Sequence, residues 1–235
     1  MARGKAGHGS KVNRKNAVSR LAAAVARIGE HEWPQRLTPT VSAALKELAA
    51  VHGLPEPDTG APDFDADKLL AELGPAAALV EPTVRNSANP TMLSAGYKVN
   101  VIPGSATAFV DGRMLPGGEE EFHRTLDELT GPHVDWKFHH GEVPLEAPVD
   151  SRTYATLRKA LEHFDPDAHV VPFCMSGGTD AKQFSRLGIR GYGFTPLKLP
   201  EGFDYQALFH GVDERVPVDA LHFGTRVLDR ALLAL

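Results

Sequence analysis

The chain has 235 residues, of which 42% are hydrophobic and 23% are charged, and its formal net charge is −5. This composition is ordinary for a globular protein and excludes disorder over most of the chain. No run approaches the roughly 20 apolar residues that cross a bilayer, and the mildly acidic balance argues against nucleic acid and membrane as partners. The single cysteine, Cys174, excludes an internal disulfide and a Cys-based zinc cluster. Any metal ligands must therefore be His, Asp or Glu.

The first 145 residues have the pattern of a split β-α-β sandwich. The first helix is predicted to be amphipathic, with Val18, Leu21, Val25 and Ile28 on one face. Strands are expected at residues 2–7, 91–104, 105–115 and 133–140, and helices at residues 13–31 and from 119 onward. Along the chain, their order is strand, helix, strand, strand, helix, strand. The two middle strands are expected to join at a Pro103-Gly104 turn. This succession predicts an antiparallel sheet with helices on one face.

A proline-rich stretch interrupts this unit between its first helix and its second strand. It predicts a helix over residues 40–52, a loop over 54–63 and a shorter helix over 66–73. We interpret residues 33 to about 90 as an insertion between core elements.

The pattern changes near residue 146, where helices begin to alternate with strands. Helices are predicted at residues 151–164, 180–187 and from 218 onward, and strands at 169–173 and 190–194. Such alternation is typical of a parallel sheet. A sheet of two strands would leave an edge and a face exposed, so we expect part of this domain to be missing or supplied by a partner.

The first candidate functional residue is His8, in the segment AGHGS. Its flanking glycines let another molecule approach the backbone, and the imidazole at a strand end would be exposed. Taken alone, the pattern also fits an ordinary histidine of a surface turn.

The second candidate group lies in NVIPGSATAFVDGR, which contains Asn100, Asp111 and Arg113. An Asn amide can donate to a developing oxyanion, and an Arg fork can hold a carboxylate through two bonds. Asp111 and Arg113 share one face of a strand because they are two residues apart. The alternative is a hairpin with a surface ion pair.

Two later segments complete the set. In SGGTDAKQF, Ser176, Gly177 and Gly178 precede a helix whose N-cap is expected to be Thr179, an arrangement that can bind an anion or simply allow tight packing. In LFHGVDERV, His210 is either a metal ligand or a structural histidine.

These four motifs, in their order and spacing, resemble the M20 family of metal-dependent peptidases and amidohydrolases. The family includes desuccinylases, aminoacylases and carboxypeptidases, which cut an amide next to a carboxylate. The resemblance covers the whole chain. The insert is similar to the enlarged lid of the carboxypeptidase S-like and N-acyl-amino-acid-hydrolase branch.

The resemblance assigns roles to seven residues. His8 matches the catalytic lid histidine that, in dimeric members, stabilises the oxyanion in the active site of the partner subunit. Arg113 matches the arginine that grips the substrate carboxylate, and His210 matches the C-terminal metal ligand. The other substrate-binding positions are Asn100, near the substrate carbonyl, and the pocket loop Gly177, Gly178 and Thr179.

The fold implied by the resemblance is α/β (α+β). A ferredoxin-like β-α-β-β-α-β dimerisation lid would occupy residues 1–145, and the C-terminal part of an α/β metallo-exopeptidase domain would occupy 146–235. The family's two-zinc centre takes its other ligands from an N-terminal half without a counterpart here, so a single zinc ligand is expected in this chain.

We therefore expect a homodimeric fragment of a zinc-dependent hydrolase of N-acyl amino acids or peptides, inactive by itself. The alternative is a non-catalytic dimerisation or carboxylate-binding module. The first 15 residues contain no apolar segment of an export signal, so a cytoplasmic chain is expected, unless a signal was lost with the missing half.

Overall fold

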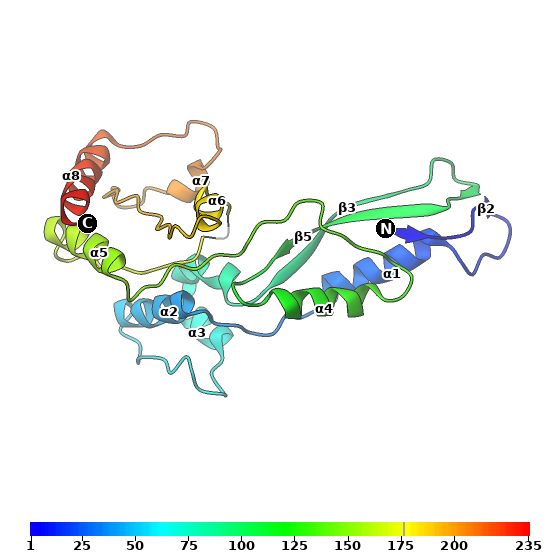
Figure 1. Cartoon of the computed structure of the whole chain (residues 1–235), viewed down its shortest axis with the longest axis horizontal. Coiled ribbons are helices and arrows are strands. Elements are labelled where there is room, and N and C mark those ends of the chain that lie inside the picture. Colours follow the sequence, from blue (N-terminus) through cyan, green and yellow to red (C-terminus); the bar gives the residue numbers. More distant parts are fainter. Residues whose placement is uncertain (176) are drawn as a thin grey trace.

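The computed structural model describes residues 1–175 and 177–235, and Figure 1 shows that the molecule is elongated. A long β-hairpin extends to one end, and α5 (Arg152–Phe164) and α8 (Val218–Ala234) lie at the other. The insert helices α2 (Pro39–Val51) and α3 (Ala66–Leu73) lie between these ends.

The main sheet contains β1 (Ala2–Arg3), β5 (Ser105–Arg113) and β3 (Ser87–Ala95) in this spatial order, with antiparallel neighbours. An isolated bridge between Ala2 and Val134 places the next segment on the other side of β1. This is the neighbour order of a split β-α-β sandwich, as predicted.

The prediction of a last strand over residues 133–140 is wrong, because Val134 forms this single bridge and no residue of the range lies in a strand. Its partner β1 has only two residues, although the N–H of Gly4 still donates to the carbonyl of Gly104 and so continues the register of β1 with β5. The predicted first strand, residues 2–7, is likewise divided between β1 and the separate β2 (Gly7–His8).

The hairpin connection also differs from the prediction. β3 ends at Ala95, which pairs with Ala106, and Gly96 follows with a φ of +69°, a conformation that glycine adopts without strain. The connection therefore spans residues 96–104 and includes β4 (Val101–Ile102), which pairs with β2. The prediction of a simple turn at Pro103-Gly104 is thus wrong.

Helices α1 (Ala17–Glu30) and α4 (Glu119–Thr130) lie along the hairpin (Figure 1). The N-cap of α1 is Asn16, whose Oδ1 accepts a 2.9 Å bond from the N–H of Val18. The buried residues of α1 include Leu21 and Ile28, as predicted, whereas Val18 is exposed. This apolar face is what holds α1 on the sheet.

Close packing of α4 on the sheet depends on a glycine in β5. A Cβ atom at Gly112 would lie 2.8 Å from the ring of Phe122, which is fully buried and stacks on Trp33 at a centroid distance of 4.8 Å. The missing side chain lets the aromatic ring reach the strand. The result is one of the molecule's main hydrophobic clusters.

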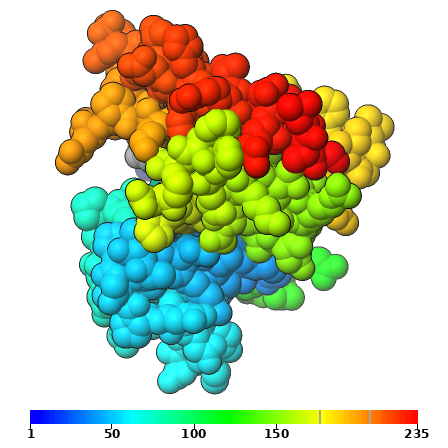
Figure 2. All heavy atoms as spheres, turned by 90° about the vertical axis from the view of Figure 1, so that its left-hand side faces the viewer, coloured from blue at the N-terminus to red at the C-terminus, as the bar shows by residue number. Residues whose placement is uncertain are grey.

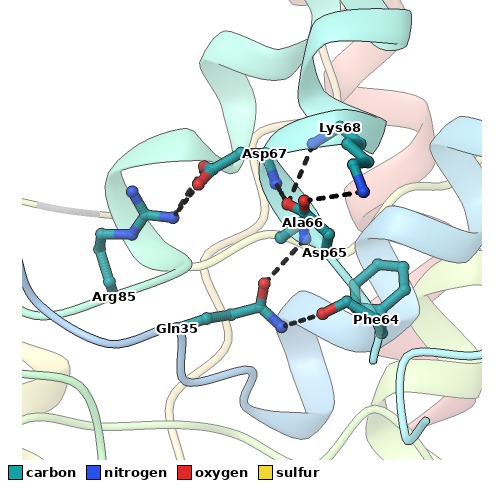
Figure 3. Close-up of polar contacts among 7 residues, drawn as sticks. All are labelled: Gln35, Phe64, Asp65, Ala66, Asp67, Lys68 and Arg85. Atoms are coloured by element: carbon teal, nitrogen blue, oxygen red, sulfur yellow. Dashed lines mark hydrogen bonds and ion pairs between the residues drawn. The ribbon is translucent and has the colours of Figure 1, made fainter. Parts of the chain in front are cut away.

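The insert between α1 and β3 has a core of its own, made by α2, α3 and two 3-10 helices, Gly74–Leu79 and Glu81–Thr83. Polar contacts lie where the insert begins and where it ends (Figure 3). Gln35 accepts a 2.7 Å bond from the N–H of Ala66, and Arg85 donates to both carboxylate oxygens of Asp67 at 2.7 Å. These bonds tie the two ends of the insert to α3.

The insert also contacts the C-terminal part of the chain. Glu146 accepts a 2.6 Å bond from the backbone N–H of Thr40, in the first turn of α2. Arg158 of α5 lies 3.6 Å from Glu47 of α2, and Cys174 packs against the insert core. Burial is the main cause that raises the pKa of the Cys174 thiol. Glu146, α5 and Cys174 thus all lie against the insert.

The C-terminal part is built around α5 and α8, whose shared core contains Ala160, Phe223, Val227 and Ala231. Figure 2 shows α5 lying between α8 and the insert helices. Within residues 177–235 and 146–175 no strand is present, so the predicted strands at 169–173 and 190–194 are wrong. Among the described residues, neither segment has a neighbouring strand with which to form a ladder of backbone bonds.

Candidate functional site

The first group of candidate residues lies at the outer tip of the hairpin. His8 in β2 is exposed, pairs with Val101 of β4, and its Nδ1 lies 2.8 Å from the hydroxyl of Ser10. The N–H of Gly9 donates a 2.8 Å bond to the carbonyl of Asn100. A Cβ at Gly9 would lie 3.2 Å from that carbonyl, so glycine permits the close approach. The structure thus places His8 and Asn100 together.

Arg113 lies at the opposite end of the hairpin. It ends β5, which begins near the tip at Ser105, and eight steps of about 3.3 Å along a strand amount to roughly 26 Å. Arg113 is therefore far from the His8 end of its own chain.

The guanidinium of Arg113 is oriented by Asp111, on the same face of β5. Its Nε lies 2.7 Å from Oδ1 and its Nη2 lies 2.8 Å from Oδ2 of that carboxylate. The Arg113 side chain is half exposed, and the hydrogen bond that it donates to Asp111 is the main cause that raises its pKa. Asp111 thus fixes the fork while leaving part of it accessible.

The predicted pocket loop begins outside the described residues at Ser176 and continues with Gly177, Gly178 and Thr179, all exposed. The expectation that Thr179 caps the following helix is wrong, because the N-cap is Asp180 and its side chain makes no capping bond. The helix, α6 (Ala181–Ser185), has only five residues. A helix this short gives little support for anion binding at its N-terminus.

Glu142, which sequence reasoning did not single out, connects the loop to the Arg113 end. Its Oε2 accepts a 2.6 Å bond from Nζ of Lys182 in α6, and this bond is the main cause that lowers the pKa of Glu142. A Cβ at Gly178 would lie 3.2 Å from the same oxygen. Glu142 also contributes to the raised pKa of Arg113. Gly178 and Lys182 thus both lie against the carboxylate of Glu142.

His210 follows the short helix α7 (Tyr205–Leu208), is exposed, and has a φ of +55°. Among the described residues, no group of three or more His, Cys, Asp or Glu side chains is placed to hold a metal ion. The described residues therefore do not form a zinc site by themselves.

Comparison with known proteins identifies the lid. The family profile for the M20 peptidase dimerisation domain matches residues 1–130. The chain is 28% identical over 222 residues to the N-fatty-acyl-amino acid synthase/hydrolase PM20D1 of Homo sapiens, covering 91% of this chain and 44% of that protein. It is 32% identical over 139 residues to the probable carboxypeptidase S-like 2 of Dictyostelium discoideum, covering 54% of this chain and 25% of that protein.

A solved structure shows the same fold. It is the crystal structure of the M20 family metallo-carboxypeptidase Sso-CP2 from Sulfolobus solfataricus, with a TM-score of 0.58 and 17% identity, covering 99% of this chain and 59% of that one.

The split β-α-β unit with its two covering helices is thus a peptidase dimerisation domain. The chain belongs to the M20 family of peptidases, whose profile matches more than half of it. It spans less than half the length of the PM20D1 relative. In the described part of the chain, no helix is both long and apolar enough to cross a membrane.

Proposed function

We propose that this chain is the dimerisation lid and C-terminal part of a hydrolase that cuts an amide next to a free carboxylate. The substrate class is an N-acyl amino acid or a peptide. The family membership and the names of the PM20D1 and carboxypeptidase relatives support the reaction class. The half-exposed Arg113 side chain supports the carboxylate requirement, because a guanidinium can bind a carboxylate through two charge-assisted bonds.

The proposed enzyme is a homodimer that associates through the lid. β3 pairs only with β5 among the described residues, so its other edge is open, and Met92 and Leu93 on this strand are mostly exposed. An open strand edge with apolar side chains favours pairing with a second chain. Sedimentation should show a dimer at tens of micromolar, and a monomer alone would contradict this part of the proposal.

The observation that carries the proposal is the separation of the candidate residues into two groups. His8 and Asn100 lie at the tip, whereas Arg113 lies roughly 26 Å away, judged from the length of β5. Groups that serve one small substrate must lie within a few ångströms of it. We therefore propose that the tip of one subunit completes the site at the Arg113 end of its partner.

Each group has a separate task in this composite site. The His8 imidazole and the Asn100 amide are suited to donate hydrogen bonds to the oxyanion that forms when the amide carbonyl is attacked. Arg113 holds the substrate carboxylate, and the loop of Gly177, Gly178 and Thr179 lines the pocket. His210 would supply one ligand to zinc, which activates water in such enzymes when bound.

Substrate binding tests the proposal without requiring turnover. Calorimetry with N-acetyl-L-leucine should detect binding to the whole chain, and N-acetyl-L-leucine methylamide, which lacks the carboxylate, should bind much more weakly. Arg113→Lys should lose most of this binding, because lysine cannot reproduce the fork. Arg124→Lys, on the exposed side of α4, is the matched control. Equal binding of both ligands would reject the carboxylate role.

A second candidate function is a carboxylate-binding or dimerisation module without hydrolytic activity. The lone His210, outside any group of metal-ligating side chains among the described residues, favours it. The two candidates differ in turnover: robust metal-dependent hydrolysis by the pure chain, abolished by His210→Ala, would establish the enzyme. For the chain as described we propose no hydrolysis by itself, because one imidazole does not make a metal centre.

A further inference from the structure

The two faces of the main sheet differ in what they contact. The even-numbered residues of β5 pack towards α1 and α4; they are Ala106, Ala108, Val110 and Gly112. Because side chains alternate along a strand, the odd-numbered residues point to the opposite face, which we call the outer face. They are Thr107, Phe109, Asp111 and Arg113. The proposed carboxylate anchor, Arg113, therefore lies on the outer face.

One cross-strand pair on the outer face is apolar. Phe109 pairs directly with Met92 of β3, and residues opposite each other on antiparallel strands share a face. Phe109 is 41% exposed and Met92 is 65% exposed. The other outer-face pairs of β3 and β5 are polar; they are Ser94 with Thr107, Asn89 with Asp111, and Ser87 with Arg113. The outer face of this ladder thus presents one apolar pair among polar ones.

His139 borders the apolar pair. Its ring centroid lies 5.4 Å from that of Phe109, and the two ring planes meet at 80°. This imidazole comes from the segment after α4, so a residue distant in sequence extends the surface that Phe109 and Met92 begin. A contiguous surface of neighbouring aromatic and apolar side chains is a candidate contact site, unlike a single exposed apolar residue.

The apolar pair lies at a distance from Arg113 that the strand sets. Four steps of about 3.3 Å along β5 separate Phe109 from Arg113, which amounts to roughly 13 Å. An extended chain advances about 3.6 Å for every three bonds, so roughly eleven bonds span this distance. The first three lead from the carboxylate carbon of an N-acyl amino acid to its acyl carbonyl carbon. An acetyl group therefore ends well short of Phe109, whereas an acyl chain of about eight carbons reaches it.

We propose that Phe109 and Met92 bind the acyl chain of an N-acyl amino acid whose carboxylate is held by Arg113, and so select long acyl chains. The inference rests on the proposed function, because it specifies the other end of the same ligand. Asn89 and Asp111 form the polar pair between the two ends. The order of cation, polar pair and apolar pair along the outer face matches the order of carboxylate, amide and hydrocarbon in the ligand.

A hydrocarbon chain suits the apolar pair better than a protein surface does. A protein that covered Phe109 and Met92 would also bury the polar pairs on either side, and burial of polar groups without partners is costly. A narrow hydrocarbon chain covers the apolar pair alone. Pairing of a second chain at the edge of β3 would leave the outer face open, because paired strands lie side by side within a sheet.

The test compares N-octanoyl-L-leucine with N-acetyl-L-leucine, by calorimetry of the whole chain at concentrations below micelle formation. The octanoyl compound should bind about tenfold more tightly or better, because its longer chain removes more apolar area from water. In Phe109→Thr the ratio of the two affinities should fall to about one, and Met92→Thr should reduce it, while threonine keeps the strand.

Leu93→Thr is the matched control. Leu93 is 61% exposed, almost as much as Met92, and follows it on the same strand, but it pairs with Ala108 and so points towards the helices. Leu93→Thr should keep the ratio of the unaltered chain. An effect that came through the edge of β3, instead of its outer face, would appear in Leu93→Thr as well and would contradict the inference.

The outcomes separate the inference from the proposed function. If the ratio survives in Phe109→Thr, or the unaltered chain does not distinguish the two compounds, while Arg113→Lys loses binding of both, the inference fails and the carboxylate role of Arg113 stands. If Phe109→Thr turns a sedimenting dimer into a monomer, the apolar pair is a contact between copies of the chain and the inference fails. If neither compound binds, both proposals fail.

Discussion

Gly9 donates its backbone N–H to the carbonyl oxygen of Asn100 over 2.8 Å. The two residues are far apart in sequence, and this bond holds the segments of His8 and Asn100 together at the tip of the lid. The bond lies next to the pairing of the two short antiparallel strands β2 and β4. We predict that His8 and Asn100 act together at this tip.

His8→Ala should lower kcat by about a hundredfold or more in a catalytically active form of the protein, the usual cost of removing one oxyanion donor. The reason is that the imidazole acts on the transition state and not on the substrate carboxylate, so KM should change little. Steady-state kinetics on an N-acyl amino acid measures both. His52→Ala, in the exposed C-cap of α2, is the control. A normal kcat in the His8→Ala enzyme would mean that His8 is an ordinary surface histidine.

Arg113→Lys should reduce kcat/KM on N-acyl amino acids severely while the fold is kept, because lysine lacks the two-pronged geometry that Asp111 orients. With a matched substrate that lacks the carboxylate, the kcat/KM of Arg113→Lys should fall only a little. Circular dichroism checks the fold, and the two substrates are compared in one assay. An equal loss on both substrates would indicate a structural role for Arg113.

The N-cap of α3 predicts a pH-dependent contribution to stability. Asp65 accepts bonds from the N–H groups of Asp67 and Lys68, at 3.0 and 3.3 Å, and the Lys68 backbone bond is the main cause that lowers its pKa (Figure 3). A lowered pKa in the folded state stabilises the fold above the unfolded pKa, near 4, and this stabilisation is lost as the pH falls through the folded value.

Asp65→Ala should therefore melt at a lower temperature than the unaltered chain at pH 7. The difference should shrink as the pH falls below about 4, because the carboxylate then becomes protonated in the unaltered chain as well. Thermal denaturation at several pH values measures it, with Asp63→Ala as a nearby control. A difference that is independent of pH would mean that the charged form is not what caps the helix.

Glu146→Ala should lower the free energy of unfolding by about 1 to 2 kcal/mol, the range for a carboxylate bonded at a helix N-terminus. Its Oε1 accepts the 2.6 Å bond from the N–H of Thr40, so the variant leaves that first-turn group without its partner. Urea denaturation provides the measurement, and Glu72→Ala is the exposed control. No change would mean that the contact between insert and C-terminal part is dispensable for stability.

The sequence predicted the helices well because their signals are local. The apolar spacing of Leu21 and Ile28 lies within one helix, and α1 covers residues 17–30 of the predicted 13–31. Short strands depend on partners elsewhere in the chain. Residues 190–194 have the composition of a strand, but no neighbouring strand is available in the described part of the molecule.

The candidate site was predictable only in parts. Each residue type in its motif indicated a chemical role, but nothing local indicated that Asn100 would lie beside Gly9, or that Glu142 would reach Lys182 across 40 positions. Such contacts are set by how the chain folds back, which periodicity does not encode. The pairing of Asp111 with Arg113 was foreseeable, since residues two apart on a strand share a face.

The central claim is that His8 of one subunit serves the Arg113 end of its partner, and a distance measurement between the two tests it most directly. One preparation carries His8→Cys and another Arg113→Cys, both in a Cys174→Ser background, each with a spectroscopically distinct spin label, so that only distances between chains are recorded. Donor contacts of roughly 3 Å to the two ends of one small substrate predict a main distance of about 20 Å or less, label linkers included. A dimer whose distances between chains all exceed about 40 Å, well beyond what one small substrate can bridge, would contradict the account.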